Sequence, residues 1–344
     1  MHLALRLFYS LLGVLPLASS TWLRIVLTIY SWTLYLSLTI LVNYFEILFD
    51  VNWIKTGQNV VTGCLGTIVD FFVYISLFHY NWTFTHQRSS CQRMVDVIRT
   101  TDKTLFSMAV FSGAVLGTTL YQYSISLLYM PRLFKPQLYK AWIYVFLSYD
   151  CFLIVLQFCA ILDSKTARIN SLKHQIKPHT ATSTRLRSLI AKKDECSKSM
   201  SSALKMYSTF IILTCLDVFC RSVHYLYIVL WGYIQSNTPG PFIFFMPFAV
   251  VSGVKLLMLV QLTQTCYKAK KSVGDFNRRL FNVVLERKDL RANETLQVIV
   301  TRWNFVEFSP GGFYQLGKGF LVSTLNSIAV YLTVLVQVSN LKSA

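Results

Sequence analysis

Long apolar runs separated by short polar connections dominate the hydrophobic pattern of this chain. Seven of these runs are long enough to cross about 30 Å of hydrocarbon as helices of roughly 20 residues. They are residues 25–49, 60–80, 105–129, 141–162, 203–233, 242–265 and 318–340. Their apolar positions follow a helical period, and each run is far longer than an ordinary β-strand. The pattern therefore predicts an all-α membrane protein with seven transmembrane helices.

The composition agrees with a chain whose surface largely faces lipid. Of its 344 residues, 54% are hydrophobic and only 14% are charged, whereas a soluble domain carries about 25% charged residues. The net charge of +18 would suit a nucleic-acid partner. However, Lys and Arg lie in short blocks between the apolar runs, where they act as topology signals. We therefore expect the lipid bilayer as a partner, and no nucleic acid.

The distribution of positive charge orients the predicted bundle. Most of the 33 Lys and Arg residues lie in the N-terminal segment and in the connections 81–104, 163–202 and 266–317. Because positively charged connections stay in the cytoplasm, we expect a cytoplasmic N-terminus and, after seven crossings, an extracellular C-terminus. A G-protein-coupled receptor has the opposite orientation. The sequons at Asn81 and Asn293 then lie inside the cell, where neither is glycosylated.

Ionisable residues within the predicted spans are informative, because each costs several kcal/mol unless it is paired or faces water. Such residues are Asp70, Asp150, Asp217, Arg221 and Lys255. Asp217 and Arg221 are four residues apart on one helix face, which predicts either an ion pair within the helix or a polar floor beneath a binding cavity. Asp70 and Lys255 are candidates for a pair across the bundle.

Aromatic side chains gather at the ends of the spans that are predicted to face outward. They form either an interfacial belt or the lining of an outward-facing ligand pocket, with Asp150 and His224 as orienting polar groups. The candidate ligand-binding residues are Tyr121, Tyr123, Trp142, Tyr144, Asp150, His224, Tyr225, Tyr227 and Trp231. Such a lining suits small amphipathic molecules, including cations held over ring faces.

The sequence offers no pattern for catalysis or for a cofactor. It contains no Gly-rich phosphate loop, no G-x-S-x-G and no H-E-x-x-H. His174 and His179 lack the further ligands of a recognisable metal site, so we interpret them as solvated loop residues. We expect no enzyme, no metal and no cofactor.

The C-terminal third carries the clearest family resemblance. The segment VYLTVLVQV, residues 330–338, follows GGFYQL at residues 311–316. It resembles the insect gustatory receptor family, whose last span carries Thr-Tyr, five hydrophobic residues and Gln-Phe. Tyr331 and Gln337 match this signature, whereas Val330 and Val338 replace the Thr and the Phe. YSLLGVLPL near the N-terminus and the long basic connection before the last span also resemble the family.

The resemblance implies a tastant-gated, non-selective cation channel made of four copies of the chain, or of co-assembled sister receptors, in the plasma membrane of a sensory neuron dendrite. The last spans would surround one central pore, with Tyr331, Val334, Gln337 and Val338 as pore or gate residues. An apolar ring at Val334 or Val338 would close the pore by dewetting, while four Gln337 amides would bond to one another or to water. Alternatively, Gln337 bonds to a single neighbouring helix in a closed bundle.

We accordingly divide the chain into three parts: residues 1–266 with six spans and the ligand pocket, residues 267–317 as a cytoplasmic anchor between subunits, and residues 318–344 with the pore helix and a short extracellular tail. An aromatic pocket with few carboxylates and amides favours bitter compounds over sugars. A G-protein-coupled receptor is the main alternative, and a transporter is a third. The charge bias disfavours a G-protein-coupled receptor, and the lack of duplicated halves disfavours a transporter.

Overall fold

The computed structural model describes residues 135–235, 242–301 and 306–341, together with the isolated positions 22, 26, 29, 30, 33, 34, 36, 37, 40, 75 and 117. For residues 135–150, 231–235, 242–248 and 338–341, and for a few single positions, it describes the backbone without the side chain. All elements of this part of the chain are helical, as the sequence predicts. The predicted spans 25–49, 60–80 and 105–129 lie outside it.

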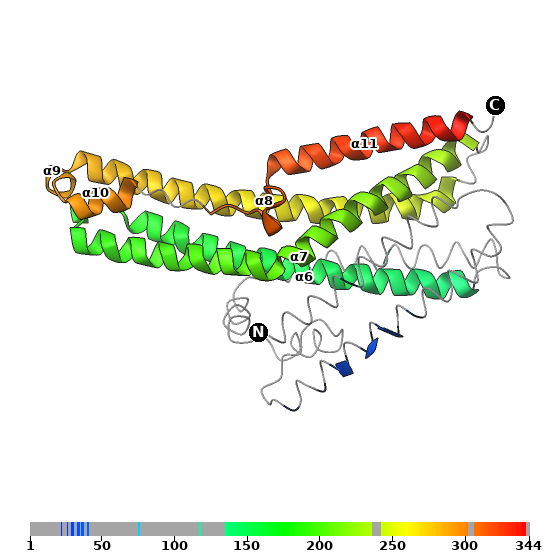
Figure 1. Ribbon diagram of the computed structural model, residues 1–344, viewed down its shortest axis with the longest axis horizontal. Coiled ribbons are helices and arrows are strands. Elements are labelled where there is room, and N and C mark those ends of the chain that lie inside the picture. The colour runs from blue at the N-terminus through cyan, green and yellow to red at the C-terminus, as the bar shows by residue number, and fades with distance from the viewer. Residues whose placement is uncertain are drawn as a thin grey trace.

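Three long helices form the framework of the described chain, and the middle one in sequence runs antiparallel to the other two (Figure 1). They are α6 (Lys135–Gln175), α7 (Ser183–Gln235) and α8 (Phe242–Glu286), and α8 packs against both α6 and α7 (Figure 1). The predicted spans 141–162, 203–233 and 242–265 lie within them. With 53 residues, α7 is about 80 Å long at 1.5 Å per residue. Because hydrocarbon is only about 30 Å thick, a large part of α7 extends beyond the membrane.

The polar connection predicted at residues 163–202 is mostly a continuation of α6 and α7. Ile169, Leu172 and Ile176 of α6 are buried, as are Leu186 and Ile190 of α7. These residues recur at three- and four-residue spacing, so that each helix carries one apolar stripe and a charged outer face. The average polarity of the segment conceals this stripe, which is why the hydropathy pattern marks only the membrane-spanning part.

Two arginines, Arg279 of α8 and Arg287 directly after it, hold the turn between α6 and α7. This turn contains the short 3-10 helix η2 (Pro178–Thr180). Arg279 donates a hydrogen bond to the carbonyl of Ile176 at 3.1 Å, and Arg287 donates to those of Pro178 and Ala181 at 3.1 and 2.7 Å. Arg287 also pairs with Asp289, and its hydrogen bonds to this carboxylate lower the pKa of Asp289 from its ordinary value. Backbone carbonyls of the turn, which have no helical partner, are satisfied in this way.

Asn293 joins the short helices α9 (Lys288–Arg291) and α10 (Glu294–Thr301) to the beginning of α7. Its Oδ1 accepts the backbone N–H of Leu296 at 3.1 Å, which caps α10. The same amide oxygen accepts Arg187 at 3.3 Å, and its Nδ2 donates to Ser183 at 3.3 Å. The amide of this sequon is therefore engaged within the folded chain.

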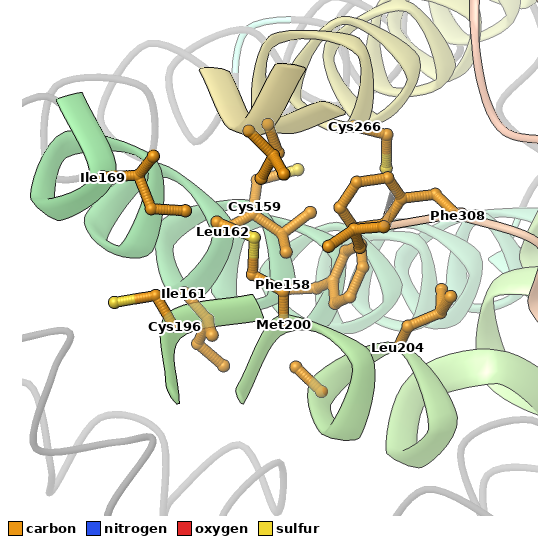
Figure 2. Packing of buried hydrophobic residues seen from close by; sticks show 14 of the residues in the cluster. Phe158, Cys159, Ile161, Leu162, Ile169, Cys196, Met200, Leu204, Cys266 and Phe308 are labelled. Atoms are coloured by element: carbon orange, nitrogen blue, oxygen red, sulfur yellow. The ribbon is translucent and has the colours of Figure 1, made fainter. Parts of the chain in front are cut away.

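The chain returns toward α7 through a segment with two glycines. Phe308 is buried in the core shared by α6, α7 and α8 (Figure 2). Leu316 is buried in the same core, and its N–H donates to the Phe308 carbonyl at 2.7 Å. Between them lies η3 (Pro310–Gly312), which packs on α7. Gly311 and Gly312 have φ values of 56° and 77°, and a Cβ on Gly311 would lie 3.1 Å from the Ile212 side chain. Only glycine fits this turn without strain.

Helix α11 (Lys318–Leu341) ends the described chain and coincides with the predicted span 318–340. It lies beside the C-terminal half of α7 and beside the first half of α8 (Figure 1). Among the described residues, the stretches Ser183–Tyr227 and Lys318–Gln337 are long and apolar enough to cross a membrane. They differ in burial: 56% of the most apolar part of the first is buried inside the chain, but only 6% of the most apolar part of the second. One side of α11 is thus available for contacts beyond this single chain.

Candidate functional site

The open side of α11 carries a regular stripe of polar and apolar residues. Asn326, Val330, Thr333 and Gln337 are all exposed, and their spacing of four, three and four residues places them on one helix face. Thr333 satisfies its hydroxyl by donating to the Ala329 carbonyl at 2.9 Å. The two amides therefore remain the strong polar groups of an otherwise apolar stripe, which we call the α11 polar stripe.

The opposite side of α11 packs against the rest of the chain. Ile328 is buried, and Leu332 and Leu335 are half-buried, whereas Val334 is 48% exposed. This division separates Gln337 and Val334 from Leu332 and Leu335. Val338 belongs to the residues for which only the helix backbone is described.

Tyr331 lies at the edge between these two sides. Its ring meets the Phe219 ring of α7 edge to face, with the centroids 5.6 Å apart and the planes at 81°. The remaining surface of Tyr331 is 56% exposed. Edge-to-face pairs of this kind contribute about 0.5–1.5 kcal/mol beyond burial. Tyr331 thus joins the pore-helix candidate to α7.

A buried ion cluster ties α7 to α8 close to this contact. Asp217 accepts Arg221 Nε at 2.6 Å within α7 and also pairs with Lys255 of α8. All three side chains are almost fully buried. The predicted pair between Asp217 and Arg221 is therefore present. Because both cations share one carboxylate, Asp217 is the residue on which the cluster depends.

The partner of Lys255 is Asp217 on α7. The predicted alternative, a pair with Asp70, involves a residue outside the described part of the chain. Since Asp217 and Lys255 are 38 positions apart in sequence, no helical spacing indicates their contact. Only the antiparallel packing of α7 and α8 brings them together.

The predicted aromatic pocket is described in part. Tyr225 is half-buried; its hydroxyl accepts Arg221 Nη1 at 3.4 Å, and its ring lies 5.6 Å from the ring of His224. Tyr227 is also half-buried on α7. Asp217, Arg221 and Tyr225 follow one another at four-residue intervals and form one polar face that runs toward the C-terminal end of α7. This face links the ion cluster to the predicted pocket.

The other predicted ligand residues are not described at side-chain level. Tyr121 and Tyr123 lie outside the described residues, and only the helix backbone is described at Trp142, Tyr144, Asp150 and Trp231. The first three of these belong to α6, and Trp231 belongs to α7 near its C-terminal end. The contribution of these six residues to a pocket stays a prediction.

Sequence reasoning missed three members of the α11 polar stripe: Asn326, Val330 and Thr333. Their spacing from Gln337 is visible in the sequence. A search centred on the signature at residues 330–338 overlooks Asn326, which lies one turn before it. It also reads Val330 only as a replacement for Thr.

Comparison with known proteins assigns the chain to a family. Residues 2–340 match the 7tm chemosensory receptor family. The fold is similar to that of the insect olfactory receptor OR5 from Machilis hrabei, with a TM-score of 0.68, 14% sequence identity, and coverage of 97% of this chain and 99% of that one. The structure of the same receptor in complex with eugenol gives a TM-score of 0.63 with the same identity and coverage. None of the curated proteins matches the sequence.

Proposed function

The chain belongs to the 7tm chemosensory receptor family, and from this premise we propose that it is a gustatory receptor that acts as a tastant-gated, non-selective cation channel. Its place is the plasma membrane of a chemosensory neuron, with the N-terminus inside and the C-terminus outside. Four copies, or copies with sister receptors, surround one pore. The lean toward bitter compounds follows from the aromatic character of the predicted pocket.

The α11 polar stripe is the observation that carries this proposal. A transmembrane helix that faces lipid cannot leave Asn326 and Gln337 unpaired without a large desolvation cost. On the described chain these side chains point away from the helices that α11 packs against. If four α11 helices surround an axis, the amides meet one another and water, which removes the cost. Val330 and Val334 then supply apolar rings that close the pore when it dewets.

The ligand pocket lies at the predicted extracellular end of α7. His224, Tyr225 and Tyr227 lie on α7 beyond the ion cluster, toward the predicted extracellular end. OR5 is described in complex with eugenol, and a small organic ligand is what we propose for this chain as well. Ligand contact with α7 would reach α11 through Phe219 and Tyr331.

Recording from cells that express this chain alone tests the function directly. A panel of bitter compounds and sugars is applied to outside-out patches with no nucleotides in the pipette. A channel gives an inward cation current that starts with the ligand and persists in the patch. A response that needs intracellular GTP would instead identify a receptor coupled to a G protein and contradict the proposal.

A further inference from the structure

Four lysines gather where α11 begins beside α8. Lys268, Lys270 and Lys271 are exposed on α8, and Lys318 is the exposed first residue of α11. The Lys318 Nζ lies 4.7 Å from the centre of the Tyr267 ring on α8. This cation–π contact brings the positive charge of α11 to the three lysines of α8. We call these four residues the α8–α11 lysine cluster.

The exposed face of α8 changes from apolar to basic at the level of the α8–α11 lysine cluster. Leu257 is 67% exposed. Tyr267 lies two to three turns later on the same face and is 39% exposed, and the exposed Lys268 and Lys271 come after it. An order of apolar, aromatic and basic residues along one face marks the passage from hydrocarbon through the headgroups to water. Phe313, in the turn before α11, is 79% exposed at the same end of that helix.

The lysine cluster has little acidic compensation along its own helices. Helix α11 contains no Asp or Glu, and the first acidic residue of α8 is Asp275. Asp275 lies one turn beyond Lys271, and its carboxylate is 4.0 Å from Lys173 of α6. Four cations on adjacent helices repel one another unless an anion joins them. Clusters of four to eight basic residues directly beside a transmembrane helix are typical of sites for phosphorylated lipid headgroups.

We propose that the α8–α11 lysine cluster binds a ligand that carries phosphate monoesters. Lys268 and Lys271 hold phosphate oxygens from α8, Lys318 holds them from α11, and Tyr267 positions Lys318. Each monoester carries about −1.5 to −2 charges at neutral pH, so two of them match the cluster. This inference rests on the proposed topology, which places the cluster at the cytoplasmic membrane surface. The phosphates belong either to an inositol lipid of the inner leaflet or to a free inositol phosphate in the cytosol.

Because Lys318 is the first residue of α11, the ligand would fix the inner end of the proposed pore helix relative to α8. The chain enters α11 through the turn that contains Gly311 and Gly312. An occupied site thus sets the starting position of α11, and an empty site releases it.

Binding to the purified full-length protein in detergent tests this proposal without any recording of current. The probes are short-chain phosphatidylinositol 4,5-bisphosphate, inositol 1,4,5-trisphosphate and, as a reference, short-chain phosphatidylcholine. We expect saturable binding of at least one phosphorylated probe, weakened by salt, and none of phosphatidylcholine. Preference for the lipid assigns the site to the inner leaflet, and equal affinity for the free inositol phosphate assigns it to a cytosolic ligand.

Matched variants locate the site. The triple variant K268Q/K271Q/K318Q should lose about a hundredfold in affinity, since each of the three basic contacts contributes roughly fivefold. The control K192Q/K198Q/K205Q removes three exposed lysines of α7 and should bind as the unaltered chain does. Y267F should retain affinity because the ring remains under Lys318, whereas Y267L should weaken it.

The proposal is overturned if neither phosphorylated probe binds, or if the two triple variants weaken binding equally. All variants change exposed side chains, and size-exclusion profiles check that they fold. Failure of the channel proposal would appear in the recordings and leave this binding result unaffected.

Discussion

The ring of Tyr331 on α11 rests edge to face on the ring of Phe219 on α7, with 5.6 Å between the centroids. Phe219 lies between Asp217 and Arg221, the two residues of α7 that belong to the buried ion cluster with Lys255 of α8. One stretch of α7 therefore touches both α8 and α11. A displacement of this stretch by a ligand would be transmitted to the proposed pore helix.

The first prediction concerns this ring pair. Phe219→Leu and Tyr331→Leu should each change the half-activating ligand concentration by about two- to tenfold, because an edge-to-face pair contributes about 0.5–1.5 kcal/mol. The double variant should change it by less than the product of the two single effects, since both remove one contact. Val322→Leu, at an exposed position of α11, is the control. Fully multiplicative effects of Phe219 and Tyr331 would show that the pair does not couple the helices.

The second prediction concerns Asp217. Asp217→Asn removes the common partner of two buried cations and should cost about 3–5 kcal/mol of stability. We expect little folded protein at the cell surface, measured by surface biotinylation. Lys255→Met removes only one of the two pairs and should be milder. Asp275→Asn is the control, because its pair with Lys173 is partly exposed and worth at most about 1 kcal/mol. Equal surface levels for Asp217→Asn and Asp275→Asn would show that the cluster does not stabilise the fold.

The sequence predicts the helical spans of α6, α7, α8 and α11 because long apolar runs have few alternatives in lipid. It also predicts the pair of Asp217 and Arg221, because four-residue spacing on a helix is a local property. The contacts of Lys255 with Asp217 and of Tyr331 with Phe219 depend on how helices pack, which no local pattern encodes. Averaged hydropathy does not predict the helical extensions of α7 and α8, because charged residues on their outer faces mask the buried apolar stripe.

The third prediction concerns Tyr225 in the proposed ligand pocket. Tyr225→Leu should raise the half-activating concentration severalfold, because desolvated stacking contributes about 0.5–1.5 kcal/mol per ring pair. Tyr225→Phe keeps the ring and loses only the hydroxyl that accepts Arg221 at 3.4 Å, so its effect should be smaller. Trp142→Leu, Tyr144→Leu and Trp231→Leu extend the test to the other predicted pocket residues. If these changes alter surface expression but never the dose-response curve, the rings serve packing or the interfacial belt.

The fourth prediction concerns topology. A C-terminal epitope should stain on intact cells, and an N-terminal epitope only after permeabilisation, because positive connections stay inside. Asn293 should carry no glycan, since it lies on the predicted cytoplasmic side and its amide bonds to Ser183 and caps α10. A mobility shift with a glycosidase that disappears in Asn293→Gln would contradict this topology, as would the reverse staining pattern.

The fifth prediction concerns the amide of Gln337. Gln337→Ala should change ion selectivity, block or spontaneous opening, because in a fourfold ring four side chains change together. Leu332→Ala, on the half-buried side of α11, should mainly lower assembly and leave selectivity as it is. Permeability ratios from reversal potentials measure the difference. An unchanged ratio, block and gating in a Gln337→Ala channel that still opens would mean that the amide bonds to a neighbouring helix.

Cysteine accessibility along α11 during ligand application tests most directly whether this helix lines a cation pore. Cysteines are introduced one at a time at Asn326, Thr333 and Gln337 of the α11 polar stripe, and at Leu332 and Leu335 as packed controls, with the unaltered chain as background. A small charged thiol reagent should reduce the current at the stripe positions, and faster with ligand than without it, while the two leucine positions react little. Current that flows undiminished after the reagent has been applied to every stripe variant would contradict the account and place the pore elsewhere.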